Sequence, residues 1–526
     1  MQGFKVVIAL AFGVAVAMGP GAGAETFRWS AGSDITTLDP TANPDAFSDG
    51  ILNDIYERLA TRDKDFNFTP ALALRWQQVN PTTLRFFLRA DVRFHDGTIL
   101  TADDVVFSLL RARRPTSDHK EAMTGVKSVV KVDALTVDVI SEKPMAPLLA
   151  HLATLGIMSK AWLTRHNAVE PHDYAGNKES HAARNAMGTG PYKLKSFEPG
   201  AKLVLERHAL WWGKHEGTVT EVVFRPIKSN ATRMAALMSG EVDFVLDPPP
   251  QDLERLRNDP RFAVVSGAEL RTLMLAFDVA RDELLYSSVK GRNPFKDKRV
   301  REAVGLAIDR EALKQKVLRG LAIPTASLVP KGVVGYSAKA AQVPAADPER
   351  ARKLLRDAGF KEGFSVTLDC SNDREQMCSA IAGMLSKIGI EVALNVSPRA
   401  KFFQRISPLN REFSMYFGGM GASTGDGAMM LESLLHTFNS KEGQGNNNAA
   451  GVAHPKYDEL LAASNAELDA KKRETLFEAL QMAEREEHYY IPLYQPVVPW
   501  IMRRGVSAAH RADNYLDLRW VGVEKR

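Results

Sequence analysis

The clearest candidate for covalent chemistry is Gly421-Ala422-Ser423-Thr424-Gly425, which has the G-x-S-x-G pattern of a nucleophile elbow. In that motif a serine on a strand-to-helix turn attacks an acyl group, and a histidine acts as the general base. Four histidines follow the motif in the chain: His436, His454, His488 and His510. Gly425-Asp426-Gly427 makes a poor first helical turn behind the serine, and no HGGG-type oxyanion segment precedes it. A secreted serine hydrolase that uses Ser423 therefore remains only an alternative.

Metal and phosphate motifs are missing from the sequence. The 12 histidines are scattered, no H-E-x-x-H pattern occurs, and the cysteines have no histidine at ligand spacing. Gly188-Thr189-Gly190 is followed by Pro191, which cannot donate the backbone amide that a phosphate-binding turn needs. We expect no metal, no other cofactor and no catalytic residue.

Cys370 and Cys378 are the two cysteines of the chain. Outside the cytosol their spacing permits a disulfide bond. Two separate buried thiols, one at a strand end and one in a helix, explain the pattern equally well. The sequence leaves both interpretations open.

The first 24 residues have the features of a cleavable export signal. Lys5 supplies the positive charge, an apolar run extends from Val6 to Met18, and Ala22-Gly23-Ala24 is a small-residue cleavage site. The apolar run is shorter than the roughly 20 residues needed to cross a bilayer, which argues against an uncleaved anchor. Glu25 would then begin the mature chain, and no cysteine stands there for attachment of a lipid.

The charge pattern argues against a nucleic-acid partner. The formal net charge is +5, and basic and acidic residues alternate along most of the chain. Beyond the export signal, no uncharged apolar run has membrane-spanning length. The 526 residues, 45% of them hydrophobic, suffice for more than one core. We expect a soluble monomer with several domains.

Two strand-helix-strand units predict an α/β fold. Their elements are, in chain order, strand 221–227, helix 230–239, strand 241–246, strand 364–368, helix 374–388 and strand 390–396. Asn230 is placed to cap the first helix, and Gly240 and Gly389 are placed to end the two helices. Such short crossovers predict parallel strands with helices packed on the sheet.

Other helices have clear boundary signals. Residues 299–318 have an apolar face, Asp347-Pro348 begins a helix that Gly359 ends, and Thr101 with Asp104 resembles a capping box. No repeat or proline-rich linker separates these segments. The domain boundaries therefore lie in ordinary loops or shared strands, and we expect lobes that the chain crosses more than once.

A series of motifs in chain order resembles one known family. The longest is LRFFLRADVRFHDG at 84–97, followed by LTADDVVFSLLR at 100–111. The others are LDP at 38–40, MGTGPY at 187–192, NPFKDKRVREA at 293–303, AIDR at 307–310 and IPLY at 491–494. The series is similar to family 5 extracellular solute-binding proteins, the dipeptide, oligopeptide, nickel and glutathione receptors of ABC importers.

This resemblance implies a two-lobed periplasmic-binding-protein fold of type II, similar to cluster C, with an extra inserted domain. Family topology assigns the segments as follows: 25–59, 184–276 and 491–526 to lobe I, 60–183 to a subdomain inserted on it, and 277–490 to lobe II. The lobes would close on a solute, and a membrane permease would recognise the closed state. The protein would be a free periplasmic receptor.

The resemblance also suggests ligand contacts after residue 419. Peptide-binding members often carry a Trp-x-x-Asp segment whose carboxylate pairs with the peptide ammonium group. Here Met420 stands in the tryptophan's place and Ser423 in the aspartate's. The form Ser423-Thr424-Gly425-Asp426 is similar to glutathione-type receptors, which makes Met420, Thr424 and Asp426 candidate ligand contacts. Asp426 either reaches a ligand cation or caps the next helix.

Three further residues are candidates for the cleft. Arg271 is suited to bidentate pairing with a ligand carboxylate, although a structural salt bridge explains it as well. Tyr416 and Tyr494 either stack on the ligand or belong to the core. The sequence thus predicts the binding component of an ABC importer for a peptide or peptide-like solute. A metal chelate, an opine or an oligosaccharide is the alternative ligand within the class.

Overall fold

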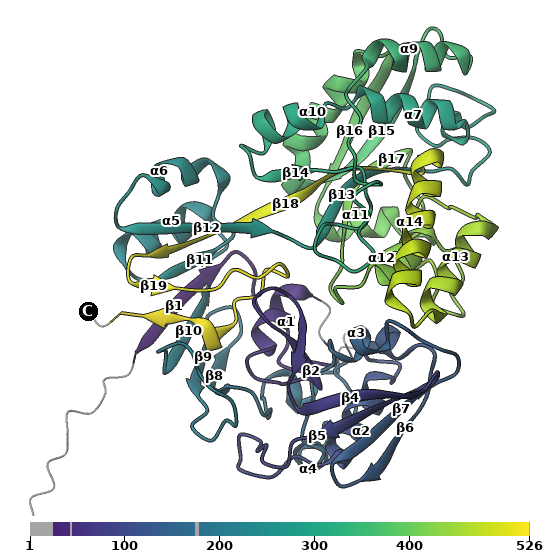
Figure 1. Cartoon of the computed structure of the whole chain (residues 1–526). Coiled ribbons are helices and arrows are strands. Elements are labelled where there is room, and N and C mark those ends of the chain that lie inside the picture. The colour runs from purple at the N-terminus through teal and green to yellow at the C-terminus, as the bar shows by residue number, and fades with distance from the viewer. Residues whose placement is uncertain (1–24, 43–44, 174–177, 525–526) are drawn as a thin grey trace, which may run out of the picture.

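The computed structural model describes residues 25–42, 45–173 and 178–524, so the predicted export signal lies outside the described residues. Figure 1 shows three bodies. Lobe I combines the beginning, middle and end of the chain, lobe II comes mainly from its second half, and an inserted subdomain contacts both lobes. This is the α/β architecture that the motifs predict.

Lobe I is built around strand β1 (Thr26–Ala31). It pairs in parallel with β10 (Glu221–Pro226) on one side and with β11 (Phe244–Leu246) on the other, and α5 (Asn230–Ser239) connects these two strands. Beyond β10, strands β9 (Lys202–Arg207) and β8 (Tyr192–Glu198) extend the sheet in antiparallel pairing. The first predicted unit is therefore present, with β1 inserted between its strands.

Lobe II contains the second predicted unit. Strands β15 (Phe364–Ser371) and β16 (Ile390–Ser397) are parallel and joined by helix α10 (Glu375–Ser386). On its other side β15 pairs in parallel with β17 (Met415–Gly421), and β17 pairs with the antiparallel β13 (Arg271–Phe277).

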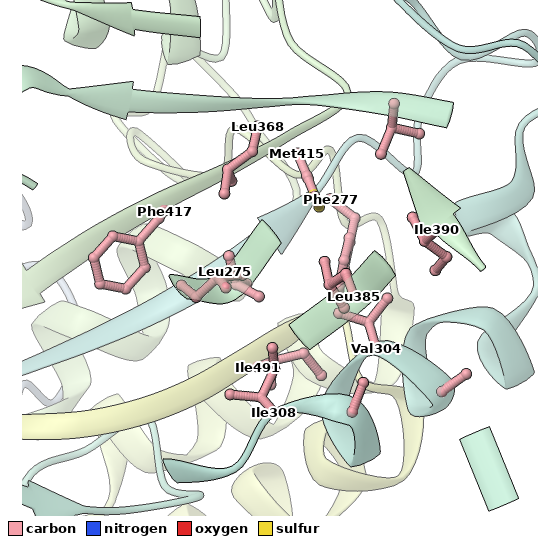
Figure 2. Packing of buried hydrophobic residues seen from close by; sticks show 14 of the residues in the cluster. Leu275, Phe277, Val304, Ile308, Leu368, Leu385, Ile390, Met415, Phe417 and Ile491 are labelled. Atoms are coloured by element: carbon pink, nitrogen blue, oxygen red, sulfur yellow. The ribbon is translucent and has the colours of Figure 1, made fainter. Parts of the chain in front are cut away.

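Apolar side chains from both layers form the core of lobe II (Figure 2). Leu275 and Phe417 come from the sheet, and Val304 comes from α7 (Lys298–Ala307), which packs on it with α9 (Pro348–Asp357). These side chains are almost completely buried. The rigid unit they create positions the strand ends described below.

Strand β18 (Tyr490–Arg503) belongs to both lobes. Its first residues pair with β13, and its later residues pair with β12 (Phe262–Ala268) in lobe I. The predicted boundaries at 276/277 and 490/491 differ from this arrangement. Because β13 is hydrogen-bonded to β17 and packs in the core of lobe II, the chain crosses between lobes near Leu270 and Gln495.

The inserted subdomain has its own sheet and core. Its antiparallel strands follow the order β4 (Ala73–Asn80), β5 (Thr83–Leu88), β7 (Thr136–Ser141), β6 (Val126–Asp133), and they pack with helix α2 (Ala102–Ala112). The core extends from Leu59 to Ile157. From Met158 onward the buried residues join the core of lobe I, so this unit is shorter than the predicted 60–183.

Several shorter elements complete the described chain. They are α1 (Ala46–Leu52), β2 (Ala60–Arg62), β3 (Phe68–Pro70), α3 (Leu148–Leu152), α4 (Lys160–Arg165), α6 (Leu253–Arg257), α8 (Arg310–Ala312), β14 (Ala322–Pro324), α11 (Arg399–Ile406), α12 (Gly427–Leu435), α13 (Pro455–Ala466), α14 (Ala470–Glu487), β19 (Val506–Ser507) and β20 (Gly522–Val523). The β2–β3 hairpin reaches lobe II, because Phe66 at its tip packs in a cluster otherwise formed mostly by residues of that lobe.

Two predicted helices differ from the structure in detail. The N-cap of α5 is Ser229 rather than Asn230, because the Ser229 hydroxyl accepts a hydrogen bond from a first-turn amide at 3.3 Å. The predicted helix 299–318 breaks after Ala307, where Ile308 is extended and Asp309 caps the next turn.

A buried ion pair joins the LDP motif at 38–40 to the LTADDVVFSLLR motif at 100–111. Arg111 donates two hydrogen bonds to Asp39, at 2.7 and 2.6 Å, and neither side chain is exposed. Burial opposes ionisation of Asp39, but the Arg111 guanidinium outweighs it and lowers the pKa of that carboxyl. This pair ties the inserted subdomain to lobe I.

Candidate functional site

The strand directions in lobe II bring several polar residues to one edge of its sheet. Since β15, β16 and β17 are parallel, their carboxyl ends lie at the same edge. The antiparallel β13 begins there, and β18 passes there at Tyr494. In open α/β sheets ligands bind outside the carboxyl ends of the strands. This edge also adjoins the crossing to lobe I, since Ala422 donates its amide to the Leu270 carbonyl.

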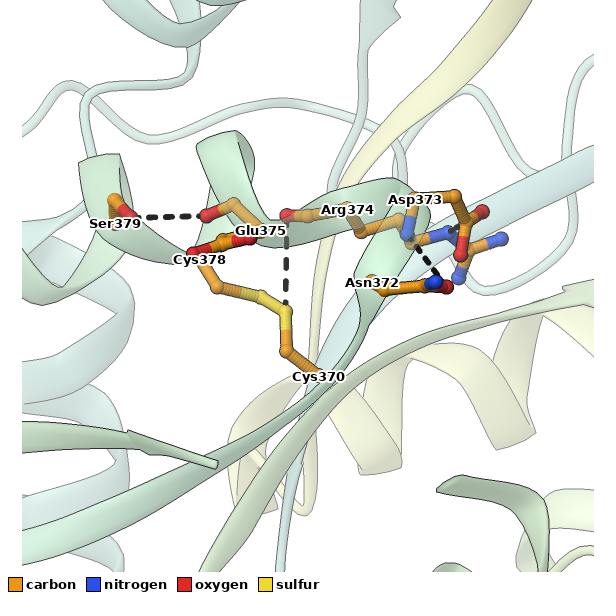
Figure 3. Close-up of a disulfide and its surroundings, with 7 residues drawn as sticks. All are labelled: Cys370, Asn372, Asp373, Arg374, Glu375, Cys378 and Ser379. Carbon is orange, nitrogen blue, oxygen red and sulfur yellow. Dashed lines mark hydrogen bonds and ion pairs between the residues drawn. A yellow bond between two sulfur atoms is a disulfide. The ribbon is translucent and has the colours of Figure 1, made fainter. Parts of the chain in front are cut away.

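A disulfide stabilises the loop at the end of β15. Cys370, the penultimate residue of that strand, is bonded to Cys378 in α10, and both are fully buried (Figure 3). The bridged interpretation of the two cysteines is the one that the structure contains. The bond closes the short loop of Asn372, Asp373 and Arg374, which carries charged groups to the sheet edge.

Three arginines give this edge a cationic character. Burial lowers the pKa of Arg374, Asp373 and Tyr494 oppose this effect, and the positive charges of Arg271 and Arg399 lower the pKa further. Arg271 lies at the first residue of β13, where its Nε donates to Glu269 at 3.0 Å and its side chain remains 30% exposed. Arg271 therefore makes a salt bridge and still faces solvent. Arg374 and Arg399 were missed by the sequence reasoning, because no motif distinguishes them from surface arginines.

The two candidate tyrosines occupy different environments. Tyr494 lies at the sheet edge, 8% exposed, with its ring centroid 6.4 Å from that of Phe417. Burial raises its pKa to about 12, and Arg374 partly offsets this rise. Tyr416 packs in the core against Phe413, 5.1 Å away between ring centroids. The structure thus favours the core interpretation for Tyr416.

Asp426 has a complete set of structural partners. Its carboxylate accepts a hydrogen bond from the Ala428 amide at 2.9 Å, as an N-cap of α12. It also accepts two hydrogen bonds from Arg473, at 2.6 and 2.9 Å, and both side chains are 7% exposed. The helix-cap interpretation is therefore the one that the geometry favours, and the charge of Asp426 is already neutralised.

The remaining residues of the 420–424 segment show no catalytic arrangement. Met420 is partly buried opposite Thr272, and the Thr424 hydroxyl accepts a hydrogen bond from the Asp426 amide at 3.2 Å. The exposed Ser423 hydroxyl contacts the sulfur of Met429 at 3.6 Å. Within the described ranges, no histidine is among the hydrogen-bond partners of Ser423.

The histidines after the motif have other contacts. His454 stacks on Tyr457, with ring centroids 4.3 Å apart, and His510 packs on Trp500 at 4.4 Å. The ring of His436 lies 3.6 Å from the Asp458 carboxylate. These positions give no support to a nucleophile elbow at Ser423.

The inserted subdomain and lobe II meet beside this segment. Arg62 donates hydrogen bonds to the carbonyl oxygens of Thr424 and Phe66, the second at 2.9 Å. A Cβ at Gly425 would collide with the side chains of Arg62 and Phe66, so this close contact between the two units requires glycine. Two further bonds cross the same boundary: Ala146 donates to the Asn465 carbonyl at 2.8 Å, and Asn446 donates to Glu121 at 2.7 Å. The sheet edge is thus closed on one side by a separate unit.

The described residues contain neither a membrane-spanning helix nor a metal-binding cluster. Among the residues that the structure describes, no helix is long and apolar enough to cross a membrane. The same residues contain no cluster of three or more side chains suited to a metal ion.

Comparison with known proteins identifies the family. Residues 67–442 match the family described as bacterial extracellular solute-binding proteins, family 5 Middle. The chain belongs to this family. The motifs of the sequence therefore carry a true relationship, and the two-lobed fold with an inserted domain is confirmed by solved relatives.

Individual relatives cover nearly the whole chain. Glutathione-binding protein GsiB of Salmonella typhimurium is 27% identical over 502 residues, which are 93% of this chain and 92% of the relative. The periplasmic binding protein DppA of Helicobacter pylori, in complex with the peptide STSA, has a TM-score of 0.79 at 25% identity. The alignment covers 95% of this chain and 98% of that one. AgaA of A. tumefaciens R10, in complex with agropinic acid, shares the fold with a TM-score of 0.77 at 22% identity over 95% and 98% of the chains.

Several family motifs of this solute-binding protein have structural roles. The Asp39–Arg111 pair connects two of them. In the MGTGPY motif, the glycines are required by close contacts with another part of the backbone. A Cβ at Gly188 or Gly190 would collide with the backbone of Asp54 and Ile55, so both positions need glycine. These motifs thus have a role in the scaffold itself.

Proposed function

We propose that this protein is the periplasmic substrate-binding component of an ABC importer for a peptide or peptide-like solute. Family membership supports the general role. The similarity to a glutathione-binding protein and to a peptide-bound DppA supports the solute class. In this proposal the export signal places a free monomer in the periplasm, and the closed form docks on the permease.

The cationic sheet edge supplies the anchor for the solute. Arg271 begins β13 and Arg374 lies in the loop after β15, and the positive charge of Arg271 lowers the pKa of Arg374. Glu269 and Asp373 offset the two positive charges only in part, since Arg374 lies 3.8 Å from the Asp373 carboxylate. A carboxylate binds best to guanidinium groups in such a partly desolvated setting. Tyr494 lies beside Arg374 and provides an aromatic surface for the rest of the solute. The single observation that carries the proposal is this arginine pair at the carboxyl edge of the sheet.

The ammonium anchor of peptide-binding relatives is not part of the proposal. Asp426 is held by Arg473 and by the α12 backbone, and Tyr416 is in the core, so neither is assigned to the ligand. Met420 and Thr424 stay in the proposal as walls of the site, because their segment joins the sheet edge to the Arg62 contact. No covalent step is proposed, and Ser423 has no catalytic role.

Isothermal titration calorimetry tests this assignment. Purified protein is titrated with glutathione and with short peptides, each compared with its carboxyl-amidated form. We expect the free carboxylate to bind at least tenfold more tightly, which corresponds to about 1.4 kcal/mol. Arg374→Gln should remove this preference, and Arg356→Gln, an exposed arginine on α9, should keep it. Equal affinity for both forms of every ligand that binds would refute the carboxylate anchor.

A further inference from the structure

A cavity lies within lobe II, apart from the sheet edge. It has a volume of about 150 Å³ and is lined by residues of α7, α9, the end of α14 and the first residues of β18. Neither Arg271 nor Arg374 lines it. An apolar cavity of roughly this volume holds a molecule the size of benzene.

Arg310 gives the cavity an unusual feature. This arginine is 6% exposed, and its Nε donates to the Pro492 carbonyl at 2.9 Å. Its Nη1 atom is buried and has no hydrogen-bond partner among the described residues. Burial, and then the positive charge of Arg485, lowers the pKa of Arg310 to about 10. No carboxylate offsets either effect.

Three other buried arginines have acidic partners, whereas the buried Arg233 is held by carbonyl and amide oxygens alone. Arg111 pairs with Asp39, Arg473 pairs with Asp426, and Arg511 pairs with Asp513 and Asp517. A buried guanidinium without an anion is costly, because its charge is desolvated and not compensated. An anion in the cavity that Arg310 lines would compensate this charge.

The other charged groups of the cavity already have protein partners. Arg350 donates to Glu302 at 2.6 Å, and Arg485 donates to the Ala340 carbonyl at 2.7 Å. Glu484 accepts the Tyr490 amide at 2.9 Å. Arg310 is therefore the charged group of the cavity that a ligand anion would pair with.

Apart from His488 and Tyr490, the rest of the wall is apolar. It includes Gly305, Leu306, Ala326, Pro344 and Ile491. The combination of one unpaired guanidinium with an apolar wall matches a small molecule with a charged end and a short hydrocarbon part.

We propose that this cavity is a second ligand site, which binds a small carboxylate with a short apolar chain. The carboxylate pairs with the Arg310 guanidinium, and the chain contacts Leu306 and Ile491. Because none of these residues belongs to the sheet edge, the site is independent of the proposed solute site.

Calorimetry with butanoate and butanamide tests the proposal, since the two probes share a shape and differ in charge. We expect wild-type protein to bind butanoate at least tenfold more tightly than butanamide. Arg310→Met should weaken butanoate binding at least tenfold. Ala326→Leu should fill the cavity and block both probes while leaving the Arg310–Pro492 bond in place. Circular dichroism verifies that each variant is folded.

Butanoate binding at the proposed solute site is separated by one control. Arg271→Ala should leave the affinity for butanoate unchanged if the probe is in the lobe II cavity. The proposal is overturned if wild-type protein does not bind butanoate, or if it binds both probes equally. It is also overturned if Ala326→Leu binds butanoate as the wild type does, or if Arg271→Ala removes the binding.

Discussion

The Arg62 guanidinium donates a hydrogen bond to the Thr424 carbonyl, and this bond joins the inserted subdomain to lobe II. Arg62 also lies over the Phe68 ring, 3.4 Å from its centroid, and burial lowers the pKa of Arg62 to about 10. A desolvated cation is thus held where two separately folded units meet. In a hinge-closing protein such contacts exist in the closed state and are lost in the open state.

Replacing Arg62 should shift the protein toward the open state. A hydrogen bond from a charged group contributes roughly 1.5 to 3 kcal/mol, so Arg62→Ala should weaken solute binding by about tenfold or more. Calorimetry measures the affinity, and small-angle scattering measures the opening. Arg113→Ala, which changes an exposed residue at the end of α2 in the same subdomain, should bind as the wild type does. Equal weakening by both substitutions would contradict a specific role for Arg62.

Loss of Arg473 should destabilise lobe II strongly. Arg473→Met leaves the buried Asp426 carboxylate without its cation, which typically costs about 3 to 5 kcal/mol. Urea unfolding measures the change. Adding Asp426→Asn to the Arg473→Met protein should recover part of the loss, and a double variant as unstable as the two single changes summed would show that the groups do not interact.

Glu484 should make stability depend on pH. Burial raises its pKa from the ordinary 4.5 to about 7. The folded state therefore holds a proton that the unfolded state releases, so the stabilising contribution is complete below pH 4.5 and is lost as the pH rises through 7. Glu484→Gln should remove this loss, with a difference of up to about 3 kcal/mol between pH 4.5 and 8. Urea unfolding of both proteins across this range measures it; parallel pH profiles would contradict the assignment.

Removing the disulfide should affect both stability and binding. For a loop of this length the chain-entropy estimate is about 2 to 3 kcal/mol of stability. The Cys370→Ala, Cys378→Ala protein should lose this amount in urea unfolding, and its affinity for solute should fall because the Asn372–Arg374 loop is less ordered. Reduced wild-type protein should behave similarly. Unchanged affinity in the double variant would show that the loop does not depend on the bond.

The sequence predicted local features best where one segment determines them. The strand-helix-strand units, the end of α5 at Gly240 and the motif series all depend on short-range patterns, and each was recovered. The exact lobe boundaries could not be predicted in the same way. Hydrogen bonds between β13 and β17 assign β13 to lobe II, and no local sequence pattern indicates that pairing.

The site was harder to predict for the same reason. Asp426 was recognised as a possible cap, but Arg473 lies 47 residues away and reaches it only in the folded protein. Arg374 resembles any helix-end arginine until the Cys370–Cys378 bond and the strand order place it beside Arg271. Arg310 belongs to the AIDR motif, and nothing in the sequence of that motif predicts the cavity that Arg310 lines.

Native mass spectrometry can measure directly whether this protein binds a solute through a carboxylate. Protein purified from the periplasm without refolding is incubated with a low-molecular-mass peptide extract and analysed for bound solute. We predict one bound peptide or peptide-like solute with a free carboxylate on the wild type and on Arg356→Gln, and its loss from Arg374→Gln. A bound solute that lacks a carboxylate, or one that Arg374→Gln retains as fully as the wild type, would contradict it.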